Sequence, residues 1–236
     1  MVDLRKFRFR KLNDPEFRHL KWLGGWLFYF SMYFITENLI PVSACHPMHM
    51  ALDDLIPFCE YFVIPYVFWY VLCFGSLLYY GIYDPKRFTD LQKFIIITQV
   101  IAMTTYILYP SRQDLRPETF EHHNLCTLIL TGLYAFDTST GVCPSLHVAY
   151  SLGIASVFLK DKEAPRWWKV LLVFLVILIS LATTFVKQHS MVDVLAAIPV
   201  GIVAEILVYG KSYWLPKLTG KTDRSDFDVR TADGRK

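Results

Sequence analysis

Six long stretches that are almost free of charged side chains constrain this 236-residue chain more than any other feature of its sequence. A helix that crosses a lipid bilayer needs about 20 mostly apolar residues, and each stretch is close to that length or longer. Two of them, 22–52 and 194–210, contain one acid each. The other four contain no Asp, Glu, Lys or Arg: 61–83, 94–111, 138–159 and 170–186. The sequence therefore predicts an all-α polytopic membrane protein.

The predicted fold is a bundle of six transmembrane helices. They are expected near 22–40, 57–80, 91–108, 144–160, 166–186 and 190–210. Residues 22–210 then form one membrane domain, between a basic N-terminal segment (1–21) and a polar tail (211–236). Only 19% of the residues are charged, against about 25% in soluble proteins. With a net charge of only +3, this composition excludes an ordinary soluble enzyme, a disordered chain and a nucleic-acid-binding protein.

The positions of the Lys and Arg residues predict the orientation of the bundle. Short cytoplasmic loops collect positive charge, and with the N-terminus inside, 21 of the 24 Lys and Arg residues fall in cytoplasmic segments. Both termini are therefore expected in the cytoplasm. The stretch 122–136, which contains no Asp, Glu, Lys or Arg, is interpreted as an interfacial segment, because a further span would place the later basic loops outside the cell. The outer side keeps three basic residues: Arg112, Arg116 and Lys187.

Three short motifs lie on this outer side, each beside the end of an expected helix. Their side chains have the chemistry that binds and attacks a phosphoryl group, namely a planar cation, a hydroxyl, two imidazoles and a carboxylate. The motifs are Arg116-Pro117, Pro144-Ser145-Leu146-His147, and the pair His189 and Asp193.

The positions of these residues on the helices favour phosphoryl transfer. The start of a helix attracts anions through its free N–H groups and positive dipole end, and Ser145 and His147 lie in such a first turn. Arg116 offers a fork of donors that matches phosphate oxygens. His189 and Asp193 share a helix face at i, i+4. The carboxylate is therefore placed to hold one ring nitrogen and leave the other free to attack.

The motifs resemble the signatures of the type-2 phosphatidic acid phosphatase superfamily of membrane lipid phosphatases and phosphotransferases. Those signatures are K-x-x-x-x-x-x-R-P, P-S-x-H and S-R-x-x-x-x-x-H-x-x-x-D. The resemblance covers 109–193, and the six expected helices extend it to nearly the whole chain. It implies that residues 22–210 form a catalytic domain and that no metal or other cofactor takes part.

The resemblance also implies a role for each site residue. His189 would be the nucleophile that forms a phosphohistidine, with Asp193 orienting it, and His147 would protonate the leaving alcohol. Arg116 and Ser145 would bind the phosphoryl oxygens, together with backbone N–H groups at the start of the fourth helix.

Two positions depart from the family pattern. The family lysine is Tyr109 here, and the family arginine is Thr183. Lys187 and Arg112 are hypothetical replacements, although Lys187 is also explained by snorkelling to the interface and Arg112 by a solvated loop charge. These departures suggest the branch that resembles inositol-phosphoryl-ceramide and sphingomyelin synthases, in which an alcohol rather than water accepts the phosphoryl group.

Other polar residues on the outer side have more than one interpretation. Asp193 also completes a capping box with Ser190, and Asp137 either bonds Arg116 or starts a turn. The sequence does not decide whether Cys126 and Cys143 form a disulfide. The first outer loop has metal-ligand chemistry but no closed zinc spacing, which favours a solvated or substrate-facing loop; its residues are His46, His49, Asp53 and Asp54.

The sequence favours an integral-membrane lipid phosphatase or phosphotransferase that acts at the extracytoplasmic face, in the plasma membrane. Its partners would be a lipid phosphate or phosphodiester substrate and the surrounding membrane lipids. Two other interpretations stay open. The two departures suggest a non-catalytic lipid-binding relative, and His147 with His189 suggests a pair of axial haem ligands.

Overall fold

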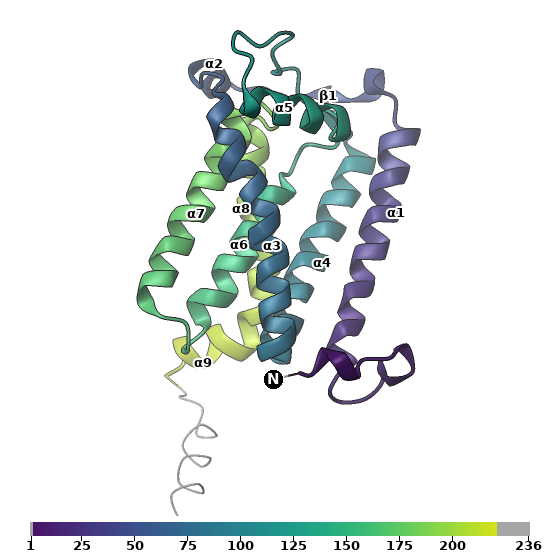
Figure 1. Ribbon diagram of the computed structural model, residues 1–236, viewed down its shortest axis with the longest axis vertical. Coiled ribbons are helices and arrows are strands. Elements are labelled where there is room, and N and C mark those ends of the chain that lie inside the picture. The colour runs from purple at the N-terminus through teal and green to yellow at the C-terminus, as the bar shows by residue number, and fades with distance from the viewer. Residues whose placement is uncertain (1, 221–236) are drawn as a thin grey trace, which may run out of the picture.

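The computed structural model describes residues 2–220 and is an all-α bundle, as predicted (Figure 1). Four helices are long and apolar enough to cross a membrane: the helix Glu60–Tyr83, which contains α3 (Val63–Tyr83), then α4 (Pro85–Leu108), α7 (Arg166–Phe185), and α8 (Met191–Tyr209) with its extension to Leu218. The other two expected helices are shorter, at 16 residues for α1 (Gly24–Leu39) and 15 for α6 (Leu146–Lys160). All six lie roughly along the long axis of the bundle, with consecutive helices running in opposite senses.

The helix boundaries differ from the predicted ones where a cap or an extension was not foreseen. α4 begins six residues early, because the Asp84 carboxylate accepts the N–H groups of Lys86 and Arg87 at 3.1 and 3.0 Å and Pro85 suits a first helical turn. At the other end, α8 continues through a π-helical turn, Gly210–Trp214, into α9, Leu215–Leu218. The predicted tail therefore begins as helix, and its part 221–236 lies outside the described residues.

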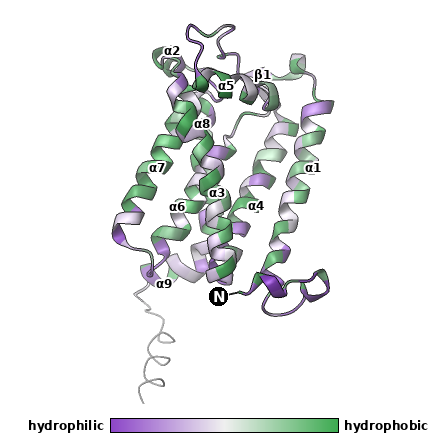
Figure 2. Ribbon diagram, viewed as in Figure 1, coloured by the Kyte–Doolittle hydropathy of each residue, from purple (hydrophilic) through white to green (hydrophobic). Residues whose placement is uncertain are grey.

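The core forms where α4 and α6 meet the other helices. α4 packs against α1, α3, α6 and α8, and α6 also packs against α7. A Cβ atom added to Gly153 on α6 would lie 2.6 Å from the Phe94 ring on α4, so this crossing requires glycine. The outward faces expose large apolar side chains such as Val170 and Leu207. In Figure 2 much of the helical ribbon, for example that of α7, has the hydrophobic colour. Such a surface is suited to lipid rather than water.

The upper end of the bundle carries the short elements (Figure 1). These are α2 (Ala51–Leu55), α5 (Leu125–Phe136), and the parallel pair of β1 (His46–Pro47) with β2 (Ser111–Arg112). α5 has 12 residues, too few to span a bilayer, and it lies across the top of the bundle, in agreement with an interfacial segment. All five cysteines are free, so Cys126 and Cys143 do not form a disulfide.

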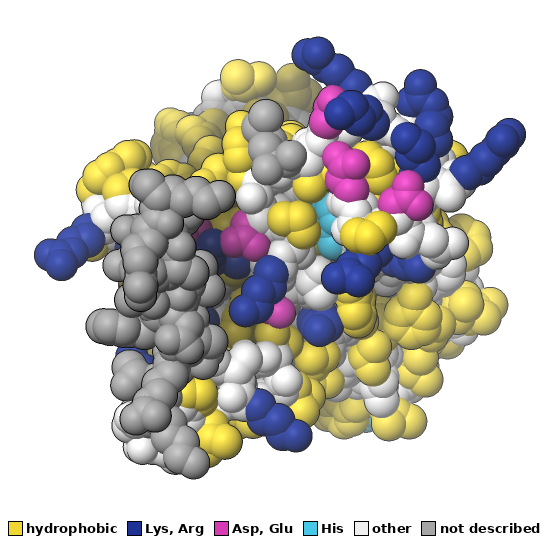
Figure 3. All heavy atoms as spheres, turned by 90° about the horizontal axis from the view of Figure 1, so that it is seen from below, with side chains coloured by type: hydrophobic (Ala, Val, Ile, Leu, Met, Phe, Trp, Pro, Cys, Tyr) yellow, Lys and Arg dark blue, Asp and Glu magenta, His cyan; other side chains and the backbone are white. Residues whose placement is uncertain are grey.

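The lower end carries the N-terminal segment and α9, so both described ends of the chain lie on the same side (Figure 1). The N-terminal segment is built from short 3₁₀ turns, and its Phe17 and His19 are buried against the bundle. Seen from below, this face displays many Lys and Arg side chains (Figure 3). The two ends of the molecule thus differ in chemistry: one is basic, and the other carries the three sequence motifs.

Candidate active site

The structure brings the second and third motifs together at the upper end. His147, in the first turn of α6, and His189, just before α8, face each other with ring centroids 5.6 Å apart. Both histidines line a polar cavity of about 60 Å³. The other lining residues come from α1, the end of α4, the loop after α5, the start of α6 and the turn before α8: Tyr29, Tyr33, Tyr106, Asp137, Thr138, Thr140, Gly141, Val142, Leu146 and Gln188.

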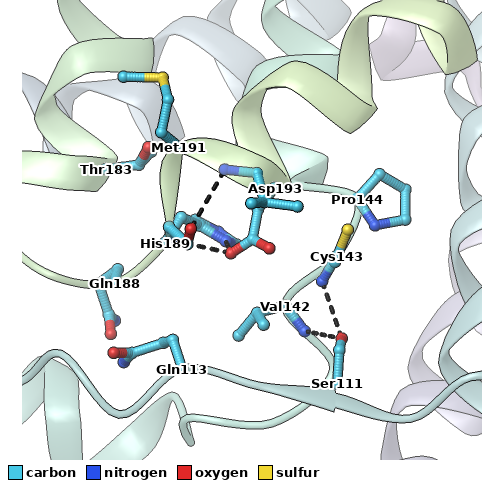
Figure 4. A network of polar contacts seen from close by, with 12 residues as sticks. Ser111, Gln113, Val142, Cys143, Pro144, Thr183, Gln188, His189, Met191 and Asp193 are labelled. Atoms are coloured by element: carbon cyan, nitrogen blue, oxygen red, sulfur yellow. Dashed lines mark hydrogen bonds and ion pairs between the residues drawn. The ribbon is translucent and has the colours of Figure 1, made fainter. Parts of the chain in front are cut away.

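The loop over this cavity, residues 137–144, is held by hydrogen bonds from the end of α4 and from β2. The Ser111 hydroxyl accepts the N–H groups of Val142 and Cys143 at 3.2 and 3.0 Å, as Figure 4 shows. The Tyr106 hydroxyl donates to the carbonyl of Pro144 at 2.7 Å. These bonds fix the chain that leads into α6, and so they fix the first turn that carries His147.

The His189 ring is oriented by Asp193, one helical turn further on. Its Nδ1 lies 3.2 Å from Oδ2 of Asp193, and the same oxygen accepts the N–H of Ser190 at 2.9 Å (Figure 4). Asp193 therefore caps α8, as the capping-box interpretation predicts, and the same carboxylate contacts the imidazole. With Nδ1 engaged, Nε2 is the ring nitrogen left for chemistry.

A second carboxylate, which the sequence places in a solvated or substrate-facing loop, holds the start of α8. Asp53 of α2 accepts the Ser190 hydroxyl at 2.5 Å and the N–H of Met191 at 2.7 Å, and it is only 3% exposed. Its neighbour Asp54 is exposed and contacts His49 at 2.8 Å, as a solvated loop residue would. The solvated interpretation was wrong for Asp53, whose partner at Ser190 lies 137 residues along the chain.

Lys187 lies in the turn between α7 and α8, where its φ of +53° is uncommon for a residue other than glycine. Its ammonium donates to the carbonyls of Asp53 and Ile56 at 3.1 and 2.6 Å, and its burial lowers the pKa of the side chain. The side chain is buried and does not line the polar cavity. It ties the turn that carries His189 to the α2 loop.

Arg112 is also engaged away from the cavity. Its Nε donates to both carboxylate oxygens of Asp114 at 3.0 Å, and its Nη1 donates to the carbonyl of Cys45 at 2.7 Å. These contacts join β2 to the loop before β1. Neither hypothetical replacement for the missing family cations therefore lies in the cavity wall.

Arg116 lies directly behind the cavity wall. Its Nη2 donates to the carbonyls of Asp137 and Thr138, both at 2.8 Å, and to the Gln188 side chain, and its guanidinium stacks on Tyr134 at 4.5 Å. Burial lowers the pKa of the guanidinium. The contact with Asp137 that the sequence left open is present, but it runs through the main chain. Nε of Arg116 has no protein partner.

The Asp137 carboxylate forms part of the cavity wall. Its Oδ2 accepts from the Gln188 amide at 3.1 Å and from the Tyr66 hydroxyl at 3.3 Å, and Oδ1 accepts from the Tyr33 hydroxyl at 3.4 Å. Burial raises the pKa of this carboxyl, although His189 and Arg116 oppose the shift. The cavity therefore contains an acid that retains its proton to a higher pH than an exposed aspartate.

The start of α6 is different, because two of its buried side-chain atoms have no hydrogen-bond partner within residues 2–220. Ser145 is fully buried and its N–H donates to the carbonyl of Asp193 at 3.1 Å, yet its hydroxyl is unpartnered. Nε2 of His147 is likewise buried without a partner, while Trp69 packs against the ring at a centroid distance of 4.2 Å. Buried polar atoms are normally hydrogen-bonded, so these two atoms have unused bonding capacity. His147 lines the polar cavity, whereas Ser145 lies beside it and is not among its lining residues.

The two positions that depart from the family pattern have structural roles here. The carbonyl of Thr183 accepts the N–H groups of Gln188 and His189, both at 3.0 Å, and Tyr109 stacks on His46 at 4.3 Å. No Lys or Arg side chain of residues 2–220 lines the polar cavity. Within the same residues, no group of three or more His, Cys, Asp or Glu side chains is arranged to hold a metal ion.

Comparison with protein families gives one match. Residues 91–217, more than half of the chain, match the family model of the PAP2 superfamily, and the match includes all three motifs. No curated protein and no solved structure matches the chain.

Proposed function

The chain belongs to the PAP2 superfamily of phosphatases and phosphotransferases, whose members are typically metal-independent, and we propose its function on this premise. The proposed protein is a membrane-embedded enzyme that transfers the phosphoryl group of a lipid through a phosphohistidine at His189. One observation carries the proposal: His189 is held at Nδ1 by Asp193 and faces His147 across a polar cavity.

In the proposed first step, Nε2 of His189 attacks the phosphorus atom and the bond to the leaving lipid oxygen breaks. His147 donates its proton to that oxygen, so the product leaves as an alcohol. Asp193 stabilises the positive charge that develops on the His189 ring. In the second step, water or an alcohol attacks the phosphorus, the bond to His189 breaks, and the proton of the acceptor passes to His147.

We propose that the start of α6 binds the phosphoryl oxygens. The Ser145 hydroxyl and the free N–H groups of this first turn offer donors and a positive dipole end. Arg116 would add its unpartnered Nε and would position Asp137 and Thr138 through their carbonyls. Lys187 and Arg112 are assigned to positioning rather than to phosphate binding, because their donors contact main-chain carbonyls of distant segments and, for Arg112, Asp114.

The charge of the cavity favours a phosphodiester substrate. Its described lining includes no Lys or Arg to balance the charge of a bound anion, and burying an unpaired charge is costly. A phosphodiester carries one negative charge, whereas a phosphate monoester carries up to two. We therefore propose the phosphotransferase branch that resembles inositol-phosphoryl-ceramide and sphingomyelin synthases, with an alcohol as acceptor.

The proposed orientation places the lower face in the cytoplasm and the site outside, in the plasma membrane. The basic lower face in Figure 3 supports it, because cytoplasmic segments collect Lys and Arg. An Asp54→Cys substitution in a chain without other cysteines tests it, since Asp54 is exposed at the site end. A membrane-impermeant thiol reagent should label this residue from outside intact cells, and labelling only after lysis would contradict the orientation.

Two other functions are compared with this proposal. A haem between the histidines is disfavoured, because the cavity of about 60 Å³ is far smaller than the roughly 300–1,000 Å³ of ordinary ligand pockets. A non-catalytic lipid-binding relative is the second candidate, favoured by the absence of Lys and Arg from the described lining of the cavity.

The test compares wild-type protein with His189→Ala in mixed micelles without added metal. Each is incubated with labelled lipid phosphates and phosphodiesters and an alcohol acceptor, and both free phosphate and new lipid are followed. New lipid that is lost in the variant supports the phosphotransferase, and phosphate release that is lost in the variant supports a phosphatase. Lipid binding without turnover in either protein would favour the non-catalytic candidate.

A further inference from the structure

An apolar groove runs between α1 and α3, below the candidate site. It consists of two cavities of about 240 and 520 Å³ that have four lining residues in common: Trp26, Phe30, Phe74 and Leu77. α1 and α3 both pack on α4. The groove is the space between these two helices, and their side chains line it.

The upper end of the groove opens on the candidate site. His147, Asp137 and Leu146 line both the upper groove cavity and the polar cavity, as do Tyr29 and Tyr33 of α1. If the phosphoryl group of a molecule lies between the two histidines, the part of the molecule attached to it can therefore extend into the groove. Continuity with the site distinguishes this groove from an ordinary depression on a lipid-facing surface.

The walls of the groove are mainly hydrocarbon, and the polar atoms of its two tryptophans bond within the protein. The indole N–H of Trp26 donates to the Gln92 side chain at 3.2 Å, and that of Trp69 donates to the carbonyl of His147 at 3.0 Å. The remaining lining is mainly Phe and Leu side chains with Cys73, and the upper cavity adds four tyrosine rings: Tyr29, Tyr33, Tyr70 and Tyr150. Burying methylene groups against such walls is favourable, whereas a polar headgroup would find few partners.

The lower end of the groove is closed by the N-terminal segment. Leu4, Leu20 and Leu23 line it there. The segment is attached to the end of α3, since the N–H of Val2 donates to the carbonyl of Ile82 at 2.7 Å and the His19 ring donates to that of Gly81 at 3.0 Å. From Tyr70 to Ile82 the groove follows roughly 18 Å of helix, at about 1.5 Å per residue. The groove thus has a defined length.

We propose that this groove binds one alkyl chain of the phosphorylated substrate and that the N-terminal segment limits the length of that chain. The proposal rests on the proposed function, because it takes the phosphoryl group to lie between His147 and His189. A second apolar groove of about 440 Å³, between α3 and α7, has no lining residue in common with the polar cavity. It serves as the comparison site.

The test uses phosphodiesters that share one headgroup and carry single alkyl chains from hexyl to octadecyl. The Leu77→Trp substitution fills the point where the two groove cavities meet, and Val71→Trp adds the same bulk to the second groove. In wild-type protein kcat/KM should rise at least tenfold with chain length and then level off. Leu77→Trp should keep the short-chain rate within twofold but lose the gain for long chains, and Val71→Trp should match wild type. An unchanged length profile in Leu77→Trp would overturn the groove.

A second pair of variants tests the N-terminal limit. Leu4 lines the lower groove, whereas Phe9 lies in the same segment, is 87% exposed and lines none of the groove. Leu4→Ala should move the plateau in kcat/KM to longer chains, and Phe9→Ala should leave it in place. The same plateau in wild type and Leu4→Ala would remove the segment from the proposal.

A binding readout separates failure of the groove from failure of the proposed function. His189→Ala is irradiated with a lipid phosphodiester that carries a photoreactive diazirine on its alkyl chain, and the labelled peptides are identified by mass spectrometry. Labelling concentrated on α1 and the facing side of α3 supports the groove even if no protein shows turnover. Labelling of α3 and α7, or of all helices equally, overturns it whether or not the enzyme is active.

Discussion

The two helix starts that carry the histidines differ in how their polar atoms are satisfied. At the start of α8, the His189 ring and the Ser190 hydroxyl both have protein partners, namely Asp193 and Asp53. At the start of α6, the Ser145 hydroxyl and Nε2 of His147 have none. The two turns are nevertheless joined, since the N–H of Ser145 donates to the carbonyl of Asp193.

This difference suggests a division of labour within the site. A nucleophile must be held in one orientation before the substrate arrives, and the bonds around His189 do this. A phosphate-binding or proton-donating atom must instead keep its bonding capacity for the substrate. Leaving such a buried atom without a partner costs the free protein about 1–3 kcal/mol, and a bound substrate would remove this cost. Substitutions at the two helix starts should therefore affect different quantities.

The largest effect is expected at His189. Replacing the nucleophile with Ala should reduce turnover by about 10³-fold or more, to the level that binding and electrostatics alone provide. Initial rates on the best substrate from the panel measure it, with circular dichroism as the check on folding. A folded His189→Ala protein with more than a tenth of the wild-type rate would argue against the assignment.

His147→Ala should have an effect that depends on the leaving group. With a lipid alcohol as leaving group, loss of the general acid should slow the reaction by about 10²–10⁴-fold. With a nitrophenolate leaving group, which needs no proton, the first step should be nearly unaffected and release of the phosphoryl group should become slow. A burst of nitrophenol followed by slow turnover is the expected record, and equal losses with both esters would contradict the acid role.

Asp53→Asn tests whether the hydrogen bonds that Asp53 accepts at the start of α8 position His189. The amide removes a charged acceptor from Ser190 and Met191, and a displacement of about 1 Å can cost roughly 10²-fold in rate. The expected result is a lower kcat with KM within twofold. Asp54→Asn is the matched control, because Asp54 is exposed and contacts only His49 among the described hydrogen bonds. Equal kcat in the two variants would make Asp53 a stability residue only.

Two serine substitutions should separate binding from stability. Ser145→Ala removes a buried hydroxyl without a protein partner among the described residues, so it should raise KM by about tenfold and leave the unfolding temperature unchanged or higher. Ser190→Ala removes a cap that bonds Asp53 and the N–H of Val192, so it should cost about 1–2 kcal/mol of stability. The comparison fails if Ser145→Ala lowers the unfolding temperature as much as Ser190→Ala does.

The smallest effect concerns the Asp137 carboxyl between the two helix starts. Burial raises its pKa in the folded protein, so the fold favours the protonated form. The free energy of unfolding should therefore fall as pH rises from the ordinary aspartate range, near pH 4, to the raised pKa, by about 1.4 kcal/mol for each unit of the shift. Unfolding temperatures across this window should decline in wild type and stay flatter in Asp137→Asn. Parallel curves would contradict the role of burial.

Much of this arrangement could be predicted from the sequence, because the signals involved are local. Charge-free stretches indicate membrane helices through their length alone, and the i, i+4 spacing of His189 and Asp193 already implies contact. The P-S-x-H motif at a helix start likewise predicts where Ser145 and His147 lie. The structure has helices at the six expected positions, of which four are long and apolar enough to cross a membrane, and it agrees with the local placement of the two motifs.

The contacts that hold the site could not be predicted, because they join distant segments through the main chain. Nothing near Asp53 indicates that its carboxylate bonds Ser190 and Met191. Long cations are equally ambiguous, since Lys187 and Arg112 have the charge that phosphate requires but donate to backbone carbonyls. An ion pair leaves a complementary residue in the sequence, whereas a bond to a carbonyl leaves no such signal.

The most direct test of the central claim is to trap the phosphoryl group on the protein. His147→Ala is mixed with the nitrophenyl phosphodiester, quenched at alkaline pH after the burst, and digested for mass spectrometry, with His189→Ala as the control. The proposed mechanism predicts a peptide that carries the phosphoryl group on His189 and is absent from the control. A burst of nitrophenol without such an adduct, or with the adduct on another residue, would contradict it.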